Sequence, residues 1–234
     1  MESNNRTARI AGSLYLINIV TGIFSLIYVP SMIEIRGDSA TAVNNLLASE
    51  FLYRSGVAVG LLSFSIFMVL PFVLFKLLRH INQGAAVLMV AFALVFIPID
   101  FVALGHKLDV LSLLHDTHYR STFSIEQLHA QMMVSLHSYD NAMVISEIFW
   151  GLWLLPFGYL VFKSDFLPKM LGIFLMVACL SDLIEVVGEV LFPGTIKGLA
   201  TTLVTLPGAV GEFGICLWLL IMGARKTLFS NPPA

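Results

Sequence analysis

The chain has 234 residues, of which 58% are hydrophobic and 12% charged, against about 45–50% and 25% in soluble domains. This composition is that of a membrane protein rather than a soluble domain. The formal net charge is −2 and the basic residues do not cluster, which argues against a nucleic-acid-binding surface. The length suits a single membrane domain over residues 1–234.

Six apolar segments follow one another along the chain, each near or above the roughly 20 residues that cross a bilayer as a helix. They cover approximately residues 10–29, 51–78, 85–104, 125–162, 167–192 and 199–222. The sequence therefore predicts an all-α, polytopic membrane protein with a bundle of six transmembrane helices.

The connections on the predicted outer side are the longer ones. The run SATAVNNLLASE, residues 39–50, is a weakly amphipathic helix pattern. Residues 105–124 form a polar, histidine-rich connection, which we expect to be a loop. Ser124 and Gln127 have the spacing of a capping box, so the fourth helix should begin there. At 1.5 Å per residue that helix is about 57 Å long and should project beyond the lipid.

The basic residues favour one side of the predicted bundle. Eight lie near helix ends on the predicted inner side: Arg6, Arg9, Lys76, Arg79, Lys163, Lys169, Arg225 and Lys226. Five lie on the other side: Arg36, Arg54, Lys107, Arg120 and Lys197. The positive-inside rule then predicts cytoplasmic N- and C-termini in the cell (plasma or inner) membrane. The first segment is too long to be a cleavable signal.

Seven carboxylates interrupt the apolar segments: Asp100, Asp140, Glu147, Asp182, Glu185, Glu189 and Glu212. An ionisable group at the bilayer centre costs roughly 2.5–3.5 kcal/mol, so such groups face a bundle interior or a water-filled cavity. By helix rise, Asp100, Glu147 and Asp182 lie at similar heights in the outer half. The pattern predicts an acidic cavity that opens outward.

The helical positions of these residues support a shared site. Asp182, Glu185 and Glu189 fall on one face of the fifth helix. His137, Asp140, Asn141 and Glu147 share an arc of the fourth helix, and Tyr15, Asn18, Gly22 and Ser25 form a polar stripe on the first. Gly56 and Gly60 have the GxxxG spacing for close helix packing. The short turn after Lys163 makes the fourth and fifth helices neighbours, so Glu147 should approach Asp182.

Three stretches resemble a bacterial membrane family. They are ARIAGSLYL, FWGLWLLPFGYLVFKSDFLPKMLGIFL and GEFGICLWLLIMGAR, and the turn from Gly158 to Pro168 is the most specific motif. The chain resembles the uncharacterised six-helix integral membrane family called domain-of-unknown-function family 4386. The resemblance implies a multi-pass protein with cytoplasmic ends and carries no activity.

A metal site is an alternative for the histidine-rich connection. His115, His118, His106 and Asp116 supply imidazole and carboxylate groups, which suit transition metals. A solvated loop is the competing interpretation. His137 with nearby acids is a second, weaker metal hypothesis, because it offers only one histidine.

No catalytic motif of the HExxH, GxSxG, Walker or GxGxxG type is present, which favours a non-enzymatic role without a cofactor. We expect a protein of the lipid bilayer that binds or transports a small cation, a proton or a small molecule. The candidate contacts are Asp140, Glu147, Asp182, Glu185, Glu212, Asp100, His137, Asn18 and Tyr15. The alternatives are a metal-dependent intramembrane hydrolase acting on lipid, or a purely structural or interaction protein.

Overall fold

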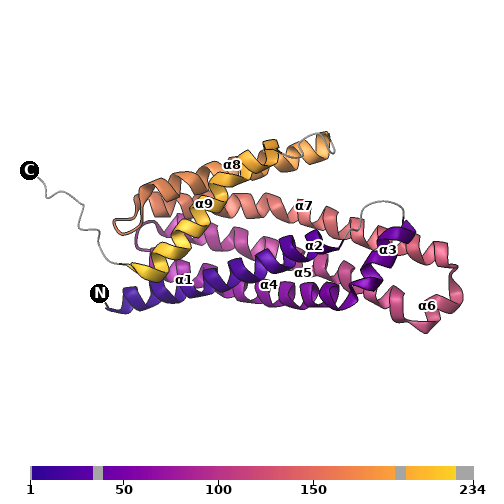
Figure 1. Cartoon of the computed structure of the whole chain (residues 1–234). Coiled ribbons are helices and arrows are strands. Elements are labelled where there is room, and N and C mark those ends of the chain that lie inside the picture. Colours follow the sequence, from indigo (N-terminus) through magenta and orange to yellow (C-terminus); the bar gives the residue numbers. More distant parts are fainter. Residues whose placement is uncertain (1, 34–38, 193–198, 225–234) are drawn as a thin grey trace, which may run out of the picture. The chain divides into compact units, whose positions relative to one another are not determined.

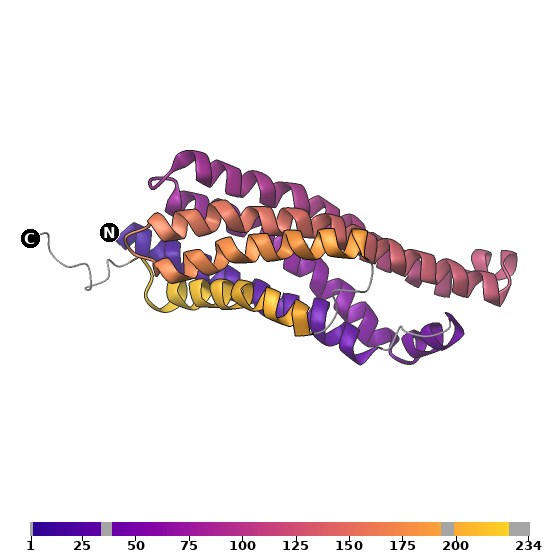
Figure 2. The ribbon, with the colours of Figure 1, turned by 90° about the horizontal axis from the view of Figure 1, so that it is seen from above.

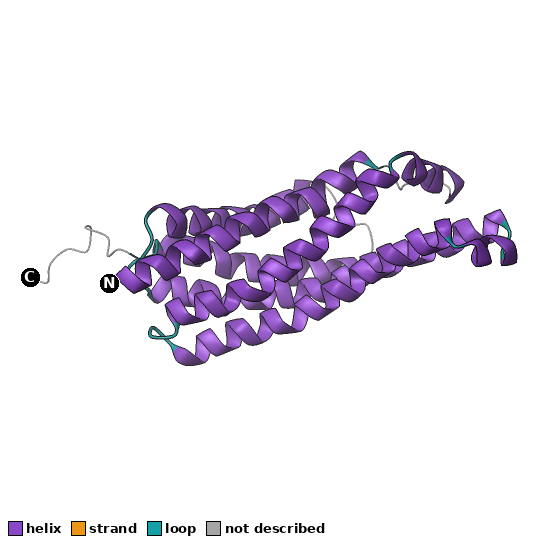
Figure 3. Ribbon diagram, turned by 90° about the horizontal axis from the view of Figure 1, so that it is seen from below, coloured by secondary structure: helices purple, strands orange, loops and turns teal. Residues whose placement is uncertain are grey.

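The computed structural model describes residues 2–33, 39–192 and 199–224, and within these ranges every regular element is a helix (Figure 3). Figure 1 labels the elements, which are α1 Glu2–Gly22, η1 Ile23–Tyr28, α2 Val29–Met32, α3 Ser39–Ala48, α4 Glu50–Leu78, α5 Gln83–His115, α6 Thr117–Thr122, α7 Ile125–Lys163, α8 Lys169–Leu191 and α9 Leu199–Ile221. The all-α fold class is therefore confirmed. Arg36, Lys197, Arg225 and Lys226, which entered the topology argument, lie outside the described residues.

Five helical stretches in the described part of the chain are long and apolar enough to cross a membrane. They are Asn4–Met32, Glu50–Leu78, Gln83–His115, Ile125–Lys163 and Lys169–Leu191, and Leu206–Ile221 is a shorter apolar helix. This composition is compatible with an integral, multi-pass membrane protein. The sixth span and the orientation of the termini remain predictions.

The chain clusters into two units, and α1, α4, α5 and α7 each contribute one segment to either unit. The first unit consists of Met1–Leu16, Phe67–Phe96 and Glu147–Ala234. The second unit consists of Ile17–Ile66 and Ile97–Ser146. Each unit is described below by itself.

In the first unit α8 packs against both α7 and α9, and Figure 2 shows these three helices side by side. Glycines allow the close approach. A Cβ atom on Gly158 of α7 would lie 2.6 Å from the carbonyl oxygen of Gly172 on α8, and the reverse distance is the same. On α9, Gly211 and Gly214 receive the side chains of Leu175 and Leu171. Small residues at these crossings let backbones pack without a hydrophobic driving force from water.

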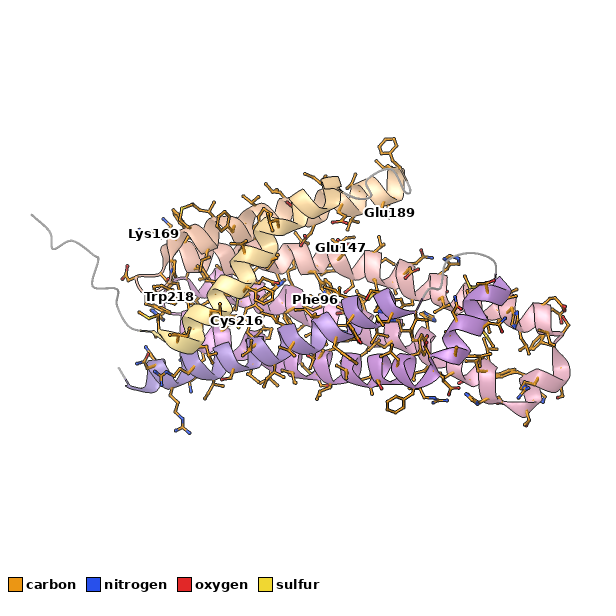
Figure 4. The ribbon with its side chains drawn as sticks, viewed as in Figure 1. Phe96, Glu147, Lys169, Glu189, Cys216 and Trp218 are labelled. Carbon is orange, nitrogen blue, oxygen red and sulfur yellow. The ribbon has the colours of Figure 1, made fainter. Side chains whose placement is uncertain are left out.

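The turn between α7 and α8 is fixed by hydrogen bonds. The Ser164 hydroxyl donates to the Val161 carbonyl (2.8 Å) and accepts from the Leu167 amide (3.1 Å). The indole Nε1 of Trp218 on α9 donates to the Phe166 carbonyl at 2.8 Å. Three elements therefore meet at this turn, and Figure 4 shows Trp218 close to the start of α8.

The second unit has its own hydrophobic core, which joins α3 to α4, α5 and α7. Val43 and Leu46 of α3 are buried in one cluster with Tyr53 of α4, Val110 of α5 and Leu128 of α7. The amphipathic helix predicted for residues 39–50 is thus present as α3. The capping box is also confirmed: the Gln127 side chain accepts from the Ser124 amide (2.9 Å), and the Ser124 hydroxyl accepts from the Gln127 amide (3.3 Å).

Two boundaries differ from the prediction. The third predicted helix was expected to end near Leu104, but α5 continues to His115, and the expected loop holds α6 as well. The extension is amphipathic, and its apolar side is buried by α3 and α7 through Val110, Leu111 and Leu113. The first helix begins at Glu2 and continues as the π-helix η1 before α2.

The predicted packing stripe on the first helical stretch is confirmed within the second unit. The Ser25 hydroxyl of η1 donates to the Gly56 carbonyl of α4 at 2.8 Å. Asn18 accepts from the Ser63 hydroxyl at 2.9 Å. A Cβ atom on Gly60 would lie 2.7 Å from the Ser25 hydroxyl, so the GxxxG pair brings η1 and α4 together.

Candidate functional site

A carboxylate-bearing face lies between α7 and α8 in the first unit. Glu147 projects from α7, and Asp182, Glu185 and Glu189 project from α8. Glu147 interacts electrostatically with all three, so the approach of Glu147 to Asp182 that the sequence predicts is present. Figure 4 labels Glu147 on α7 and Glu189 near the C-terminal end of α8. We call these four residues the α7–α8 acidic face.

Gly151 of α7 makes room for the acidic face. A Cβ atom at this position would lie 2.9 Å from the Asp182 Cβ and 3.4 Å from its Oδ2. Because glycine has no side chain, Asp182 can lie directly against the α7 backbone, one helical turn beyond Glu147. The spacing of the acids along the sequence does not point to Gly151, so its role beside Asp182 is a feature that sequence reasoning missed.

The negative charges of the four carboxylates are not neutralised by nearby donors or basic groups of the described residues. Within the described residues, none of them takes part in a hydrogen bond or an ion pair, and all four side chains are half-buried. Like charges held together in a poorly solvated place repel one another, and a proton or a cation relieves that repulsion. The face is therefore chemically suited to binding protons or positively charged groups.

Glu212 of α9 also belongs to the first unit, but it accepts a hydrogen bond from a tyrosine. The hydroxyl of Tyr15, which is 1% exposed, donates to Glu212 Oε1 at 2.9 Å. Glu212 also interacts electrostatically with Asp182. The contact brings together two candidates that are 197 positions apart in the sequence. It also gives Glu212 a structural role between α1 and α9.

Aromatic side chains form a continuous stack in the first unit. The Trp153 ring stacks on Phe157 with centroids 5.1 Å apart and meets Phe67 edge-on at 5.2 Å. Phe96 contacts both Phe67 (5.1 Å) and Trp150 (6.0 Å). Because α7 supplies both tryptophans, the stack fixes the helix that carries Glu147. Sequence analysis did not single out these aromatic residues.

The remaining candidates from the apolar segments belong to the second unit. Asp100 is fully buried and accepts a hydrogen bond from the Ser146 hydroxyl at 2.5 Å. Asp140 interacts electrostatically with Lys107. Asn18 accepts a hydrogen bond from the Ser63 hydroxyl. His137 is exposed on α7.

The candidate metal ligands of the histidine-rich stretch lie on α5, on α6 and between these two helices. Across the described residues, no three His, Cys, Asp or Glu side chains are grouped so that they could hold a metal ion. His115 Nε2 lies 2.9 Å from Glu50 Oε1, and His106 lies 3.3 Å from Asp109. Asp116 caps α6 by accepting from the His118 amide at 2.8 Å. The side chains of His115, His106 and Asp116 thus make separate contacts, and His118 supplies its backbone amide to Asp116.

A protein-family model matches most of the chain. Residues 10–223 fit the family described as "Domain of unknown function (DUF4386)", and the chain belongs to this family of uncharacterised domains. The predicted resemblance is thereby confirmed. No curated protein and no solved structure matches the chain.

The structure explains the chemistry of the motif that carried the resemblance. Gly158 opens the backbone crossing with α8, Ser164 caps the turn, and Phe166 supplies the carbonyl for Trp218. Pro168 stands at the N-cap of α8. All four residues shape the turn that aligns α7 with α8, and so they position the acidic face without belonging to it.

Proposed function

We propose that the protein is a non-enzymatic membrane protein that binds a small cation, a proton or a positively charged small molecule at the α7–α8 acidic face. The observation that carries the proposal is the approach of Glu147 to Asp182, Glu185 and Glu189 without a described basic partner. Four carboxylates at one place in a membrane protein are costly unless something neutralises them. Transport of the bound species is the role that such a site serves in a multi-pass protein.

We also propose a membrane location and an orientation for the chain. It lies in the cell membrane, with both termini in the cytoplasm, the acidic face open to the outer side and the lipid bilayer as its main partner. The basic residues of the turns Lys76–Arg79 and Lys163–Lys169 support this orientation.

The test measures thermal stability of the purified protein in detergent against pH and against a series of cations. Ionisation of the four carboxylates increases their mutual repulsion, so the parent should lose stability as pH rises and regain it when a bound cation is added. Asp182→Asn and Glu147→Gln should reduce both responses. Asp165→Asn is the matched control, because Asp165 is exposed in the turn between α7 and α8.

Two outcomes would contradict the proposal. A parent protein whose stability depends on neither pH nor cations has no ligand at the acidic face. Equal responses from Asp182→Asn, Glu147→Gln and Asp165→Asn would place the binding elsewhere.

A structural role is the second candidate, and specific contacts favour it for two of the acids. Glu212 accepts from Tyr15 and Asp100 accepts from Ser146, so both have neutral hydrogen-bond donors. Isosteric amides at these two positions keep a hydrogen-bond acceptor. We therefore expect Asp100→Asn, which lies in the second unit, to leave the cation response of the acidic face intact.

A further inference from the structure

Lys107 of α5 is an ammonium held inside the second unit. The residue is only 8% exposed, and its Nζ lies 3.9 Å from the centre of the Tyr139 ring on α7. The Tyr139 ring therefore lies directly against this ammonium.

The surroundings hold the lysine backbone in place. The Tyr53 hydroxyl of α4 donates to the Lys107 carbonyl at 3.3 Å. Tyr53 is buried beside this carbonyl. Three helices thus contribute to one cluster, which we call the Lys107 cluster: Tyr53, Lys107, Tyr139 and Asp140.

Negative charge completes the cluster. Asp140, which follows Tyr139 on α7, acts electrostatically on Lys107. An aromatic face with a carboxylate nearby is the chemistry by which proteins recognise ammonium ligands, because the ring quadrupole and the anion both attract the cation. Tyr139 supplies the aromatic face and Asp140 the carboxylate, and the Lys107 ammonium already lies against the Tyr139 ring.

We propose that Tyr139 and Asp140 form an ammonium-recognition site that the chain fills with its own Lys107. The lysine acts as a tethered ligand that closes the site to free amines. A primary alkylammonium ion with a short unbranched chain, which matches the lysine stem, is the ligand class that the site takes when Lys107 is removed. This site lies on α5 and α7 of the second unit and does not depend on the proposed function of the α7–α8 acidic face.

The experiment is a chemical rescue. Lys107→Ala removes the tethered ammonium and leaves Tyr139 and Asp140 in place. Added n-butylammonium chloride should stabilise Lys107→Ala saturably, with a rise in melting temperature of about 2–4 °C. Sodium chloride at the same concentration is the control for ionic strength. The parent protein should not respond, because its own lysine occupies the ring.

A double variant tests where the amine binds. Lys107→Ala with Tyr139→Leu lacks the aromatic face and should lose the rescue. The proposal is overturned if Lys107→Ala does not respond to butylammonium, if the double variant responds equally, or if the parent responds as strongly.

A second measurement keeps the proposal testable when Lys107→Ala does not fold. Reductive methylation of the folded parent, read by mass spectrometry, should modify exposed Lys163 quickly and Lys107 slowly. Tyr139→Leu should raise the rate at Lys107 and leave the rate at Lys163 unchanged. Equal rates at the two lysines in the parent, or no change at Lys107 in Tyr139→Leu, would overturn the proposal.

Discussion

At the scale of single residues, glycine decides where an acidic side chain can be placed. Asp182 lies against α7 only because residue 151 has no side chain. A pattern of carboxylates on one helix identifies a face, but the gap that receives it belongs to another helix. The hydropathy and helical spacing of α8 therefore predicted the face, and the fit to Gly151 required the structure.

Gly151→Ala should destabilise the protein and weaken its response to cations. The new Cβ would lie 2.9 Å from the Asp182 Cβ, so either Asp182 or α8 must shift. Overpacking of this kind costs about 1–3 kcal/mol. The measurement is unfolding in detergent, together with the cation titration described above.

Gly105→Ala is the control for this substitution. Gly105 lies in α5, and nothing is within 4 Å of the position that its Cβ would occupy. Alanine favours a helix over glycine by up to about 1 kcal/mol, so Gly105→Ala should be neutral or stabilising. A Gly151→Ala protein as stable as Gly105→Ala would show that the space beside Asp182 is not needed.

At the scale of elements, helix ends carry contacts that the sequence does not reveal. Glu50 at the start of α4 accepts from Arg54 Nε at 2.6 Å and lies 2.9 Å from His115 Nε2 at the end of α5. One carboxylate thus joins two helix ends of the second unit. The sequence makes His115 a candidate metal ligand, because residue type alone does not show that Glu50 lies next to it.

The His115–Glu50 contact should couple the end of α5 to the start of α4. His115 Nε2 lies 2.9 Å from Glu50 Oε1, so removal of either side chain removes the same contact. In a double-mutant cycle, His115→Gln and Glu50→Gln should therefore be non-additive in the free energy of unfolding. His118→Gln, at an exposed position, is the control. Additive effects of His115→Gln and Glu50→Gln would contradict a direct contact.

The turn between α7 and α8 should depend on its hydrogen bonds. Trp218→Phe keeps the aromatic ring but removes the donor to the Phe166 carbonyl, and Ser164→Ala removes the cap on Leu167. Each change should cost about 0.5–1.5 kcal/mol of stability. Trp218→Phe should lower stability without changing the cation response of the folded protein. Unchanged unfolding of both variants would show that the turn is held by packing alone.

The third predicted helix shows why element boundaries are harder to predict than element types. Its apolar run ends at Leu104, since Gly105, His106 and Lys107 follow, and a transmembrane pattern stops there. The helix nevertheless continues, because Val110, Leu111 and Leu113 recur at helical spacing and are buried by other helices. Lipid-facing hydropathy detects only the first part, whereas the second part is stabilised by tertiary packing.

At the scale of the whole molecule, class and family followed from composition and motif, while function did not. The helical class needs only long apolar runs, which the chain has. The pairing of Tyr15 with Glu212, and of Ser146 with Asp100, joins residues far apart in the chain. Helical periodicity does not contain that information. The structure was needed to distinguish Glu212 and Asp100, which accept these hydrogen bonds, from the four carboxylates of the α7–α8 acidic face.

Membrane topology is the prediction that belongs to this scale. A cysteine placed at His115 should react with a membrane-impermeant thiol reagent on intact cells, and one placed at Lys163 should not. The background is favourable, because native Cys179 and Cys216 are both buried. Both target positions are exposed in the structure. The reverse labelling pattern would contradict the cytoplasmic termini and the outward opening of the acidic face.

The π-helix η1 has a consequence for how relatives of this chain differ in length. Hydrogen bonds from i to i+5 enclose one more residue per turn than those of an α-helix, so Ile23–Tyr28 accommodates an extra residue without rotating the helix on either side. Loss of one residue here, such as the exposed Ile27, would leave an ordinary α-helical turn. The loss of one residue between Gly56 and Gly60 of α4 would rotate one glycine away from the other and break their shared contact with Ser25 of η1. Family members should therefore tolerate single-residue gaps between Gly22 and Val29, and not within the GxxxG segment.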